Sequence, residues 1–185
     1  TDGESARKTN NLKINRRKEQ AINCCKFLKT EKPIFFDFPD NKLDSVPLIN
    51  IIKNLEKIIK KLKPNVIYTH YFGDLNIDHQ KTFEAVNVAC RPLKKNIIKN
   101  IICFEILSSS EWQISNKKKF NPNYFVNIDN EIKKKLSALK IYKNELRKYP
   151  HSRSLKGVKA LSMYRGIQSA NKNAEAFYIA RSIEK

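Results

Sequence analysis

The amino-acid sequence predicts an α/β sandwich built on a largely parallel sheet. Short apolar runs of strand type, such as 66–69 and 101–106, alternate with longer segments whose apolar residues recur at helical spacing, such as 48–62. With 185 residues, of which 41% are hydrophobic, the chain has the size of one well-buried domain. Ligands of such sheets bind beyond the carboxyl ends of the strands, so functional side chains are expected in the loops that follow them.

The first part of the chain alternates helices and strands. Apolar spacing predicts a helix, a strand, a helix and a strand, over residues 13–29, 34–38, 48–62 and 66–69. We expect Pro39 to end the first strand and Pro64 to stop the second helix. Ser45 is predicted as the N-cap of that helix, with Pro47 tolerated in its first turn.

The rest of the chain continues the alternation. The pattern predicts strands at 101–106 and 124–126, and helices at 80–89, 132–146 and 155–168. Pro150 is expected to close the long helix, and 176–180 fits either a final strand or a helical turn. No repeat or linker divides the chain, so we expect one domain over residues 1–185.

The excess of positive charge invites a nucleic-acid interpretation, because 37 Lys and Arg residues stand against 18 Asp and Glu. The distribution favours solvated helix faces instead, since many of the lysines fall on the polar sides of the predicted helices. The sequence holds no Gly-rich RNA-binding motif and no zinc-finger spacing. We therefore expect no nucleic-acid partner, while a preference for anionic ligands stays open.

No part of the sequence predicts a membrane span or a signal peptide, because no apolar run approaches the length that a bilayer requires. The four cysteines form no C-x-x-C pair, which argues against a zinc–cysteine site and favours buried free thiols in a reducing compartment. The expected location is the cytoplasm.

The most informative segment is the loop after strand 66–69, because two of the three histidines of the chain lie within it or at its end. Imidazole and carboxylate side chains bind metals and move protons near neutral pH, and residues 70–79 supply both types. A plainer interpretation makes Asp78 the cap of the next helix, with His79 merely in its first turn. That interpretation leaves His70, Asp74 and Asn76 unexplained.

Several short motifs follow one another along nearly the whole chain. They comprise Thr1-Asp2-Gly3, Arg16-x-x-Glu19, Thr69-His70 running to Asp78-His79, Phe104-Glu105-Ile106, Ser108 to Trp112, Phe120 to Asn123, Pro150 to Ser154 and Ala174 to Phe177. In this order, the motifs resemble the PIG-L (LmbE-like) de-N-acetylase family. The resemblance implies a Rossmann-like fold with a three-layer sandwich. It also implies a zinc-dependent hydrolase that removes the acetyl group from an N-acetylglucosamine-type sugar or sugar conjugate.

In that family, zinc is held by an early His-Pro-Asp-Asp segment and a later histidine, and only the later one matches here, at His79. The Thr-Asp-Gly motif ends the second strand of the family fold. We therefore expect that this chain begins after the first strand and helix, as an N-terminally truncated domain. A catalytic zinc needs about three protein ligands, so the chain as written is expected to lack both the complete metal site and the general base.

The resemblance also assigns catalytic roles, some of which stay open. Many family members carry a histidine where this chain has Asn76, whose amide can donate to an oxyanion but cannot deliver a proton. His70 or His151 is the candidate general acid. Asp78 is expected either to orient a histidine or to cap the helix.

The remaining candidates are substrate-binding residues. Arg16 and Glu19 share one helix face, and they form either a weak surface ion pair or a contact with the sugar hydroxyl groups. Glu105 lies inside the apolar pattern of the predicted strand 101–106, where an unpaired carboxylate would be costly, so it needs a partner, for which Arg91 and Arg153 are candidates. Arg153 could also hold a phosphate or a carboxylate of the substrate.

Two other functions compete with the hydrolase. The first is a non-catalytic remnant of a deacetylase, which the unmatched opening segment supports. The second is a basic nucleic-acid-binding domain, which a salt-dependent affinity would reveal. The sequence does not decide the sugar, its linkage to a nucleotide or a lipid, or the oligomeric state.

Overall fold

The structure, a computed structural model, describes residues 1, 11–93 and 97–184, and for residues 11–14 it describes the backbone alone. Two members of the opening motif, Asp2 and Gly3, lie outside these ranges, as does the side chain of Ile14. The chain forms two compact units. The first combines 1–40 with 125–175, and the second combines 41–124 with 176–185.

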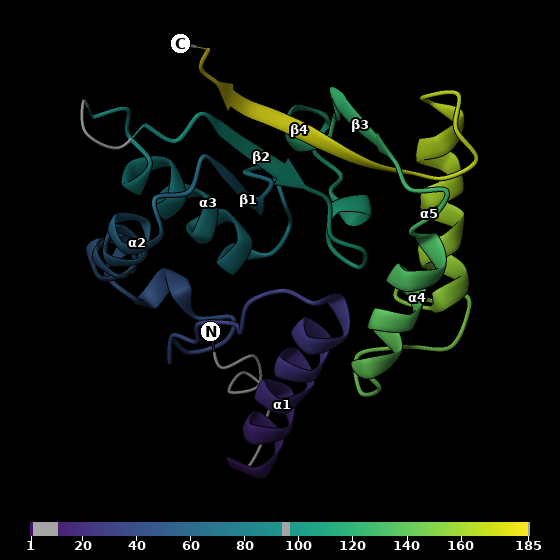
Figure 1. Cartoon of the computed structure of the whole chain (residues 1–185), viewed down its shortest axis with the longest axis horizontal. Helices are drawn as coiled ribbons and strands as arrows, with labels where there is room; N and C mark the ends of the chain where they lie inside the picture. Colours follow the sequence, from purple (N-terminus) through teal and green to yellow (C-terminus); the bar gives the residue numbers. More distant parts are fainter. Residues whose placement is uncertain (2–10, 94–96, 185) are drawn as a thin grey trace. The chain divides into compact units, whose positions relative to one another are not determined.

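Helices dominate the first unit (Figure 1). It holds α1 (Asn11–Leu28), α4 (Ile132–Ile141) and α5 (Leu155–Ile167), and α4 contacts both of the others. The expected helices at 13–29 and 155–168 are thus confirmed. The expected helix at 132–146 is shorter, because the backbone leaves the helical region at Tyr142, where ψ is 55°.

The expected strand at 34–38 is wrong. None of these residues belongs to a helix or a strand, and the side chains of Ile34 and Phe35 are exposed. Proline lies on either side of the segment, at Pro33 and Pro39, and neither can donate a ladder hydrogen bond. An aromatic run alone does not make a strand without a neighbour to pair with.

The second unit packs α2 (Leu48–Leu62) and α3 (Ile77–Ala89) side by side, with α3 against strand β1 (Val66–His70) (Figure 1). The helix at 48–62 is confirmed, and it ends at Lys63 in the left-handed conformation just before Pro64. Ser45 is not its N-cap. Ser45 belongs to the short helix Leu43–Ser45 and donates to the carbonyl oxygen of Lys42, while Pro47 occupies the cap position.

A four-stranded sheet has the order β1-β2-β4-β3, with β2 at Asn100–Phe104, β3 at Tyr124–Asn127 and β4 at Ala174–Ser182. β1 and β2 are parallel, with His70 opposite Phe104, whereas β2 and β4 are antiparallel. The fold is therefore mixed α/β, and the expected largely parallel sheet is not confirmed. The segment 176–180, left open by the sequence, lies in β4.

The core of the second unit lies between α3 and the parallel strands. Its buried members are Val86, Cys90, Ile98 and Ile101, and partly buried side chains of α2 and β1 pack against them. These apolar contacts fix β1 and β2 side by side, so the two loops that leave their carboxyl ends start at the same edge of the sheet. Among the described residues, no helix is long and apolar enough to cross a bilayer.

Candidate functional site

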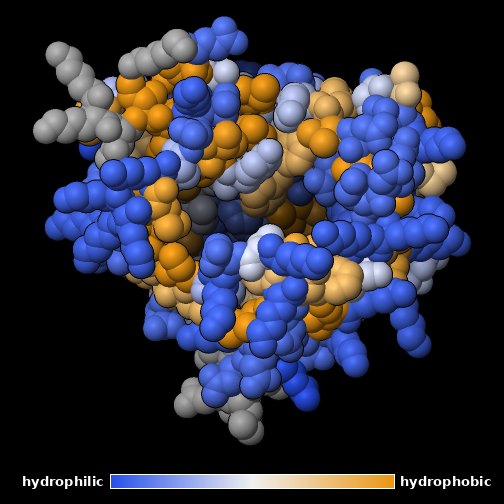
Figure 2. All heavy atoms as spheres, viewed as in Figure 1, coloured by the Kyte–Doolittle hydropathy of each residue, from blue (hydrophilic) through white to orange (hydrophobic). Residues whose placement is uncertain are grey.

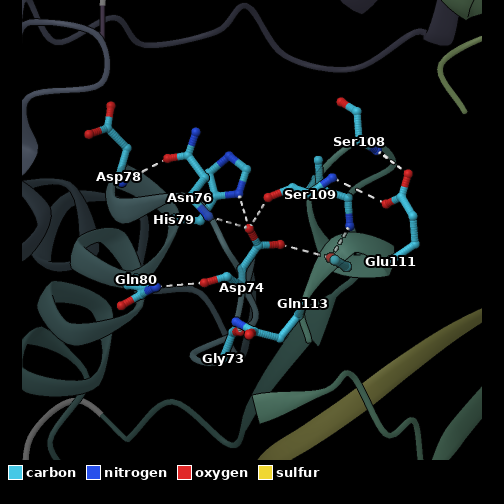
Figure 3. Close-up of polar contacts among 12 residues, drawn as sticks. Gly73, Asp74, Asn76, Asp78, His79, Gln80, Ser108, Ser109, Glu111 and Gln113 are labelled. Atoms are coloured by element: carbon cyan, nitrogen blue, oxygen red, sulfur yellow. Dashed lines mark hydrogen bonds and ion pairs between the residues drawn. The ribbon is translucent and has the colours of Figure 1, made fainter. Parts of the chain in front are cut away.

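The loop after β1 and the loop after β2 meet at Asp74. The parallel register brings the ends of the two strands together, and residues 71–76 and 105–113 follow them. Gly73 allows a close approach in this region, because a Cβ atom there would collide with the carbonyl oxygen of Lys118. The side chain of Gln113 donates to the Gly73 carbonyl oxygen at 2.8 Å, which joins the two loops (Figure 3).

Asp74 is the centre of this junction, with 1% of its surface exposed. Its carboxylate accepts hydrogen bonds from Ser109 Oγ, from Ser110 Oγ at 2.8 Å and from the backbone N–H of Asn76 at 3.0 Å (Figure 3). Its Oδ1 also lies 3.0 Å from Nδ1 of His79. Burial by itself raises the pKa of Asp74, but the hydrogen bonds from His79, Ser109, Asn76 and Ser110 outweigh it and lower the pKa to about 2. The carboxylate is therefore ionised at neutral pH.

His79 lies in the first turn of α3 and is held on two sides. One of its ring nitrogens faces Asp74, and its ring stacks on that of His70 with centroids 4.0 Å apart and planes 3° apart. The side chain keeps 19% of its surface exposed. A buried carboxylate against one imidazole nitrogen is the arrangement that orients histidine ligands of metals in proteins.

His70 ends β1 and is held neutral by its surroundings. Burial first, and then the nearby His79, lower the pKa of His70 to about 4, and Asp74 opposes the shift only in part. Its Nδ1 atom is buried and has no hydrogen-bond partner among the described residues. His70 also lines a cavity of about 330 Å³ whose walls are mostly apolar side chains of α2, β1 and α3.

Asn76, not Asp78, is the N-cap of α3. The side-chain oxygen of Asn76 accepts from the Asp78 N–H at 2.8 Å, and its amide group donates to Asn41 Oδ1 at 2.9 Å. The carboxylate of Asp78 accepts from the backbone N–H groups of Asn41, at 2.7 Å, and Leu43, at 2.9 Å. The expectation that Asp78 caps the helix is therefore wrong, because Asp78 lies inside the helix and anchors the 41–43 turn.

Asp78 is also expected to orient a histidine. In the structure, the carboxylate that contacts His79 is that of Asp74 instead. Whether Asp78 takes part in catalysis stays a prediction. Glu105 directly follows β2 and is half-buried, so it lies after the strand and not within it. Of its two expected partners, Arg91 lies 4.0 Å from Glu56 and Arg153 pairs with Glu145.

The other predicted site residues lie in the first unit. Arg16 and Glu19 are exposed on α1. His151 and Arg153 belong to the turn before α5, where Nδ1 of His151 accepts from the Arg153 N–H at 3.1 Å. The Arg153 guanidinium donates to Glu145 at 2.9 Å, and Arg17 pairs with the same carboxylate. Their predicted catalytic and substrate-binding roles stay predictions.

Sequence reasoning missed the roles of Ser109 and Ser110, although their position directly after a strand was a signal. Ser108 adopts φ 69°, and Glu111 accepts from the N–H groups of Ser108, at 2.6 Å, and Ser109, at 3.1 Å. These bonds form a compact turn that directs both hydroxyl groups toward Asp74 (Figure 3).

The family resemblance implies a bound zinc ion, which requires side chains that can act as its ligands. His79 fits the part of a ligand, because one nitrogen is anchored and the ring is partly exposed. No group of three His, Cys, Asp or Glu side chains that could hold a metal occurs within the described ranges. Taken alone, these residues do not fit a complete zinc site.

Comparison with solved structures first defines the class of fold. N,N'-diacetylchitobiose deacetylase from Pyrococcus horikoshii aligns with a TM-score of 0.70 at 17% identity, over 91% of this chain and 64% of that chain. A conserved protein from Thermus thermophilus aligns with a TM-score of 0.71 at 20% identity, over 92% and 76%. The 4-carboxy-2-hydroxymuconate hydratase GalB from Pseudomonas putida gives 0.71 at 19% identity, over 99% and 82%.

At such low sequence identities, the similarity establishes a shared fold alone. Proteins with this fold include both a deacetylase and a hydratase. The chain spans 64% of the length of the diacetylchitobiose deacetylase. A search of curated proteins finds no match.

Residues 1–90 match the model of the PIG-L family, described as GlcNAc-PI de-N-acetylase. The resemblance to the PIG-L family is thereby confirmed, and the matched residues include the segment from His70 to His79.

Proposed function

We propose that the complete protein is a zinc-dependent hydrolase that removes the acetyl group from an N-acetylglucosamine-type sugar or sugar conjugate. The observation that carries the proposal is His79, anchored on the buried carboxylate of Asp74 within the segment that matches the PIG-L family. The N,N'-diacetylchitobiose deacetylase among the structural neighbours is consistent with this reaction. The four free cysteines fit a cytoplasmic location, which is part of the proposal.

Zinc in such a site would lower the pKa of a bound water and polarise the acetyl carbonyl. Of the described residues, His79 would hold it, and these residues supply no group of three ligands around it. Asp74 keeps the His79 ring in place, and Ser109 and Ser110 keep Asp74 in place. These contacts preorganise one side of the site before substrate arrives.

Amide hydrolysis also needs a proton for the departing amine. His70 is neutral at pH 7, because its pKa is lowered to about 4, and a neutral imidazole is a weak acid. The Nδ1 atom of His151 accepts from the Arg153 N–H at 3.1 Å, so this ring is also neutral, with its proton on Nε2, and the acid role of His151 stays a prediction. Asn76 already uses its amide oxygen and one amide hydrogen, so it has one N–H left for substrate.

The test is a comparison of His79→Ala with the wild type in the complete protein. We expect loss of bound zinc and loss of acetate release from N-acetylglucosamine and its conjugates. Asn87→Ala is the matched control, because Asn87 is exposed on the same helix, and it should keep both. Stoichiometric zinc and full activity in His79→Ala would overturn the assignment.

The charge of the chain supports an anionic substrate, such as a sugar linked to a nucleotide or to a lipid phosphate. The formal net charge is +19, and hydrophilic side chains cover much of the face seen in Figure 2. Fixed positive charge attracts anions, and the attraction weakens as salt rises. We expect faster turnover of the anionic conjugate than of N-acetylglucosamine at low salt. The difference between the two turnover rates should become smaller at high salt. A preference for the neutral sugar would contradict this.

A non-catalytic remnant is the alternative, and the absence of a three-ligand group among the described residues favours it. The same assay decides between the two. A complete protein that binds no zinc and releases no acetate from any N-acetyl sugar would support the remnant. A salt-dependent affinity for DNA or RNA, without hydrolysis, would instead support the nucleic-acid-binding function.

A further inference from the structure

The PIG-L resemblance assigns no role to Asp74, yet its buried carboxylate is bonded to His79, Ser109, Ser110 and the backbone N–H of Asn76. Its donors come from three segments: the loop after β1, the first turn of α3, and the turn after β2. A carboxylate with 1% exposure and this many donors is costly to bury unless each bond is made. Its bond to His79 has a chemical consequence beyond stability.

An ionised carboxylate can only accept hydrogen bonds. Asp74 Oδ1 lies 3.0 Å from Nδ1 of His79, so that nitrogen must carry a proton. In the neutral ring the lone pair then belongs to Nε2. Stacking on His70, at 4.0 Å between centroids, sets the plane of the ring, and the bond to Asp74 sets its rotation within that plane.

We propose that Asp74 is a positioning residue that fixes His79 in the tautomer protonated at Nδ1 and ties the start of α3 to the Ser109–Ser110 turn. Use of the His79 Nε2 lone pair in hydrolysis rests on the proposed function. The tautomer of His79 and the link between α3 and the Ser109–Ser110 turn do not depend on the proposed function. Ser109 shares Oδ1 with His79, while Ser110 binds Oδ2, so the two hydroxyl groups hold the carboxylate at both oxygens.

The tautomer is measured directly from the imidazole ¹⁵N chemical shifts of the metal-free protein, at a pH where the histidines are neutral. We expect His79 to carry its proton on Nδ1. His151 is an internal reference, because its Nδ1 accepts from a backbone N–H and its proton should lie on Nε2. A His79 proton on Nε2 in the wild type would overturn the proposal, whatever any variant does.

Asp74→Ala removes the acceptor that faces Nδ1 of His79. A neutral imidazole without such a partner favours its proton on Nε2, so we expect the His79 proton to move there while His151 stays unchanged. Ser110→Ala is the matched control, because it removes the bond to Oδ2 and leaves the Oδ1 bond to His79 in place. The control should keep the wild-type tautomer. A folded Asp74→Ala protein that retains the proton on Nδ1 would contradict the proposal.

Zinc titration of the complete protein supplies a second measurement. Loss of an outer partner of a metal-binding histidine typically costs about 10- to 100-fold in affinity, and we expect that range for Asp74→Ala. Should the complete protein release no acetate while the tautomers match expectation, the proposed function fails and the positioning role stands. Unchanged zinc affinity in Asp74→Ala would refute the positioning role in metal binding.

Discussion

Two histidine turns of this chain, one in each compact unit, resemble each other in sequence setting and differ in chemistry. His79 begins α3 behind the N-cap Asn76, and His151 precedes α5 and its N-cap Ser154. His79 faces the buried carboxylate of Asp74 through Nδ1. His151 instead accepts from a backbone N–H through the same atom.

The difference teaches that the partner of one ring nitrogen decides what the other can do. A carboxylate partner makes Nδ1 a donor and leaves a lone pair on Nε2, as a metal ligand or base requires. A backbone N–H partner makes Nδ1 an acceptor and leaves a proton on Nε2, as a donor requires. The same residue type therefore has opposite uses in the two turns.

The largest expected effect on stability distinguishes the carboxylate near each histidine turn, Asp74 in the second unit and Glu145 in the first. Asp74→Ala should lower the free energy of unfolding by about 3–5 kcal/mol, because several buried donors lose their acceptor at once. Glu145→Ala should cost about 1–2 kcal/mol, since its partners Arg17 and Arg153 keep 31% of their side chains exposed. Urea unfolding of both variants measures the difference, and equal losses would remove the contrast between the two regions.

The second prediction concerns acid, and it applies to the metal-free protein. His70 stays neutral in the folded state down to its pKa of about 4, whereas the unfolded chain binds a proton below about 6.5. The unfolded state thus binds more protons between these values, so stability is complete above pH 6.5 and falls by up to about 3 kcal/mol as the pH drops to 4. Unfolding free energies over this range check it.

His70→Gln is the control for this pH dependence, because it keeps a polar side chain and removes the titrating group. We expect it to flatten the decline between pH 6.5 and 4. An unchanged slope in that variant would show that another group causes the loss.

The smallest expected effect compares the two helix caps. Ser154 accepts from the Gly157 N–H at 2.9 Å, and Ser154→Ala should cost about 1 kcal/mol. Asn76→Ala should cost slightly more, because the bond to Asn41 is lost as well. Asn76→Asp keeps the capping oxygen and should recover most of the loss. Urea unfolding tests the order, and a larger loss for Ser154→Ala would reverse it.

Local features of the chain were readable from its sequence. Unbroken apolar spacing predicted the helix at 48–62, and apolar runs predicted β1 and β2 to within two residues at either end. The sequence also indicated the histidine loop as the candidate functional segment, because side chains of that chemistry follow a strand directly, and its function stays a prediction. Each of these signals depends on residues within about one helical turn or one strand length.

Errors arose where a residue's partner is distant along the chain. The aromatic run at 34–38 had strand composition, but strand formation needs a neighbour that composition does not reveal. Asp78 had the position of a cap, and its carboxylate instead binds the 41–43 turn, more than thirty residues away. β4 pairs antiparallel with β2, a direction that no local pattern encodes.

The sequence by itself determined the helices, most of the strands and the segment that carries His79. Only the tertiary structure decided that Asp74 is the partner of that histidine and that Ser109 and Ser110 hold the carboxylate. The physical reason is that helical and strand patterns follow from the backbone and nearby side chains. A buried carboxylate takes its hydrogen-bond donors from whichever segments the packed sheet brings to it.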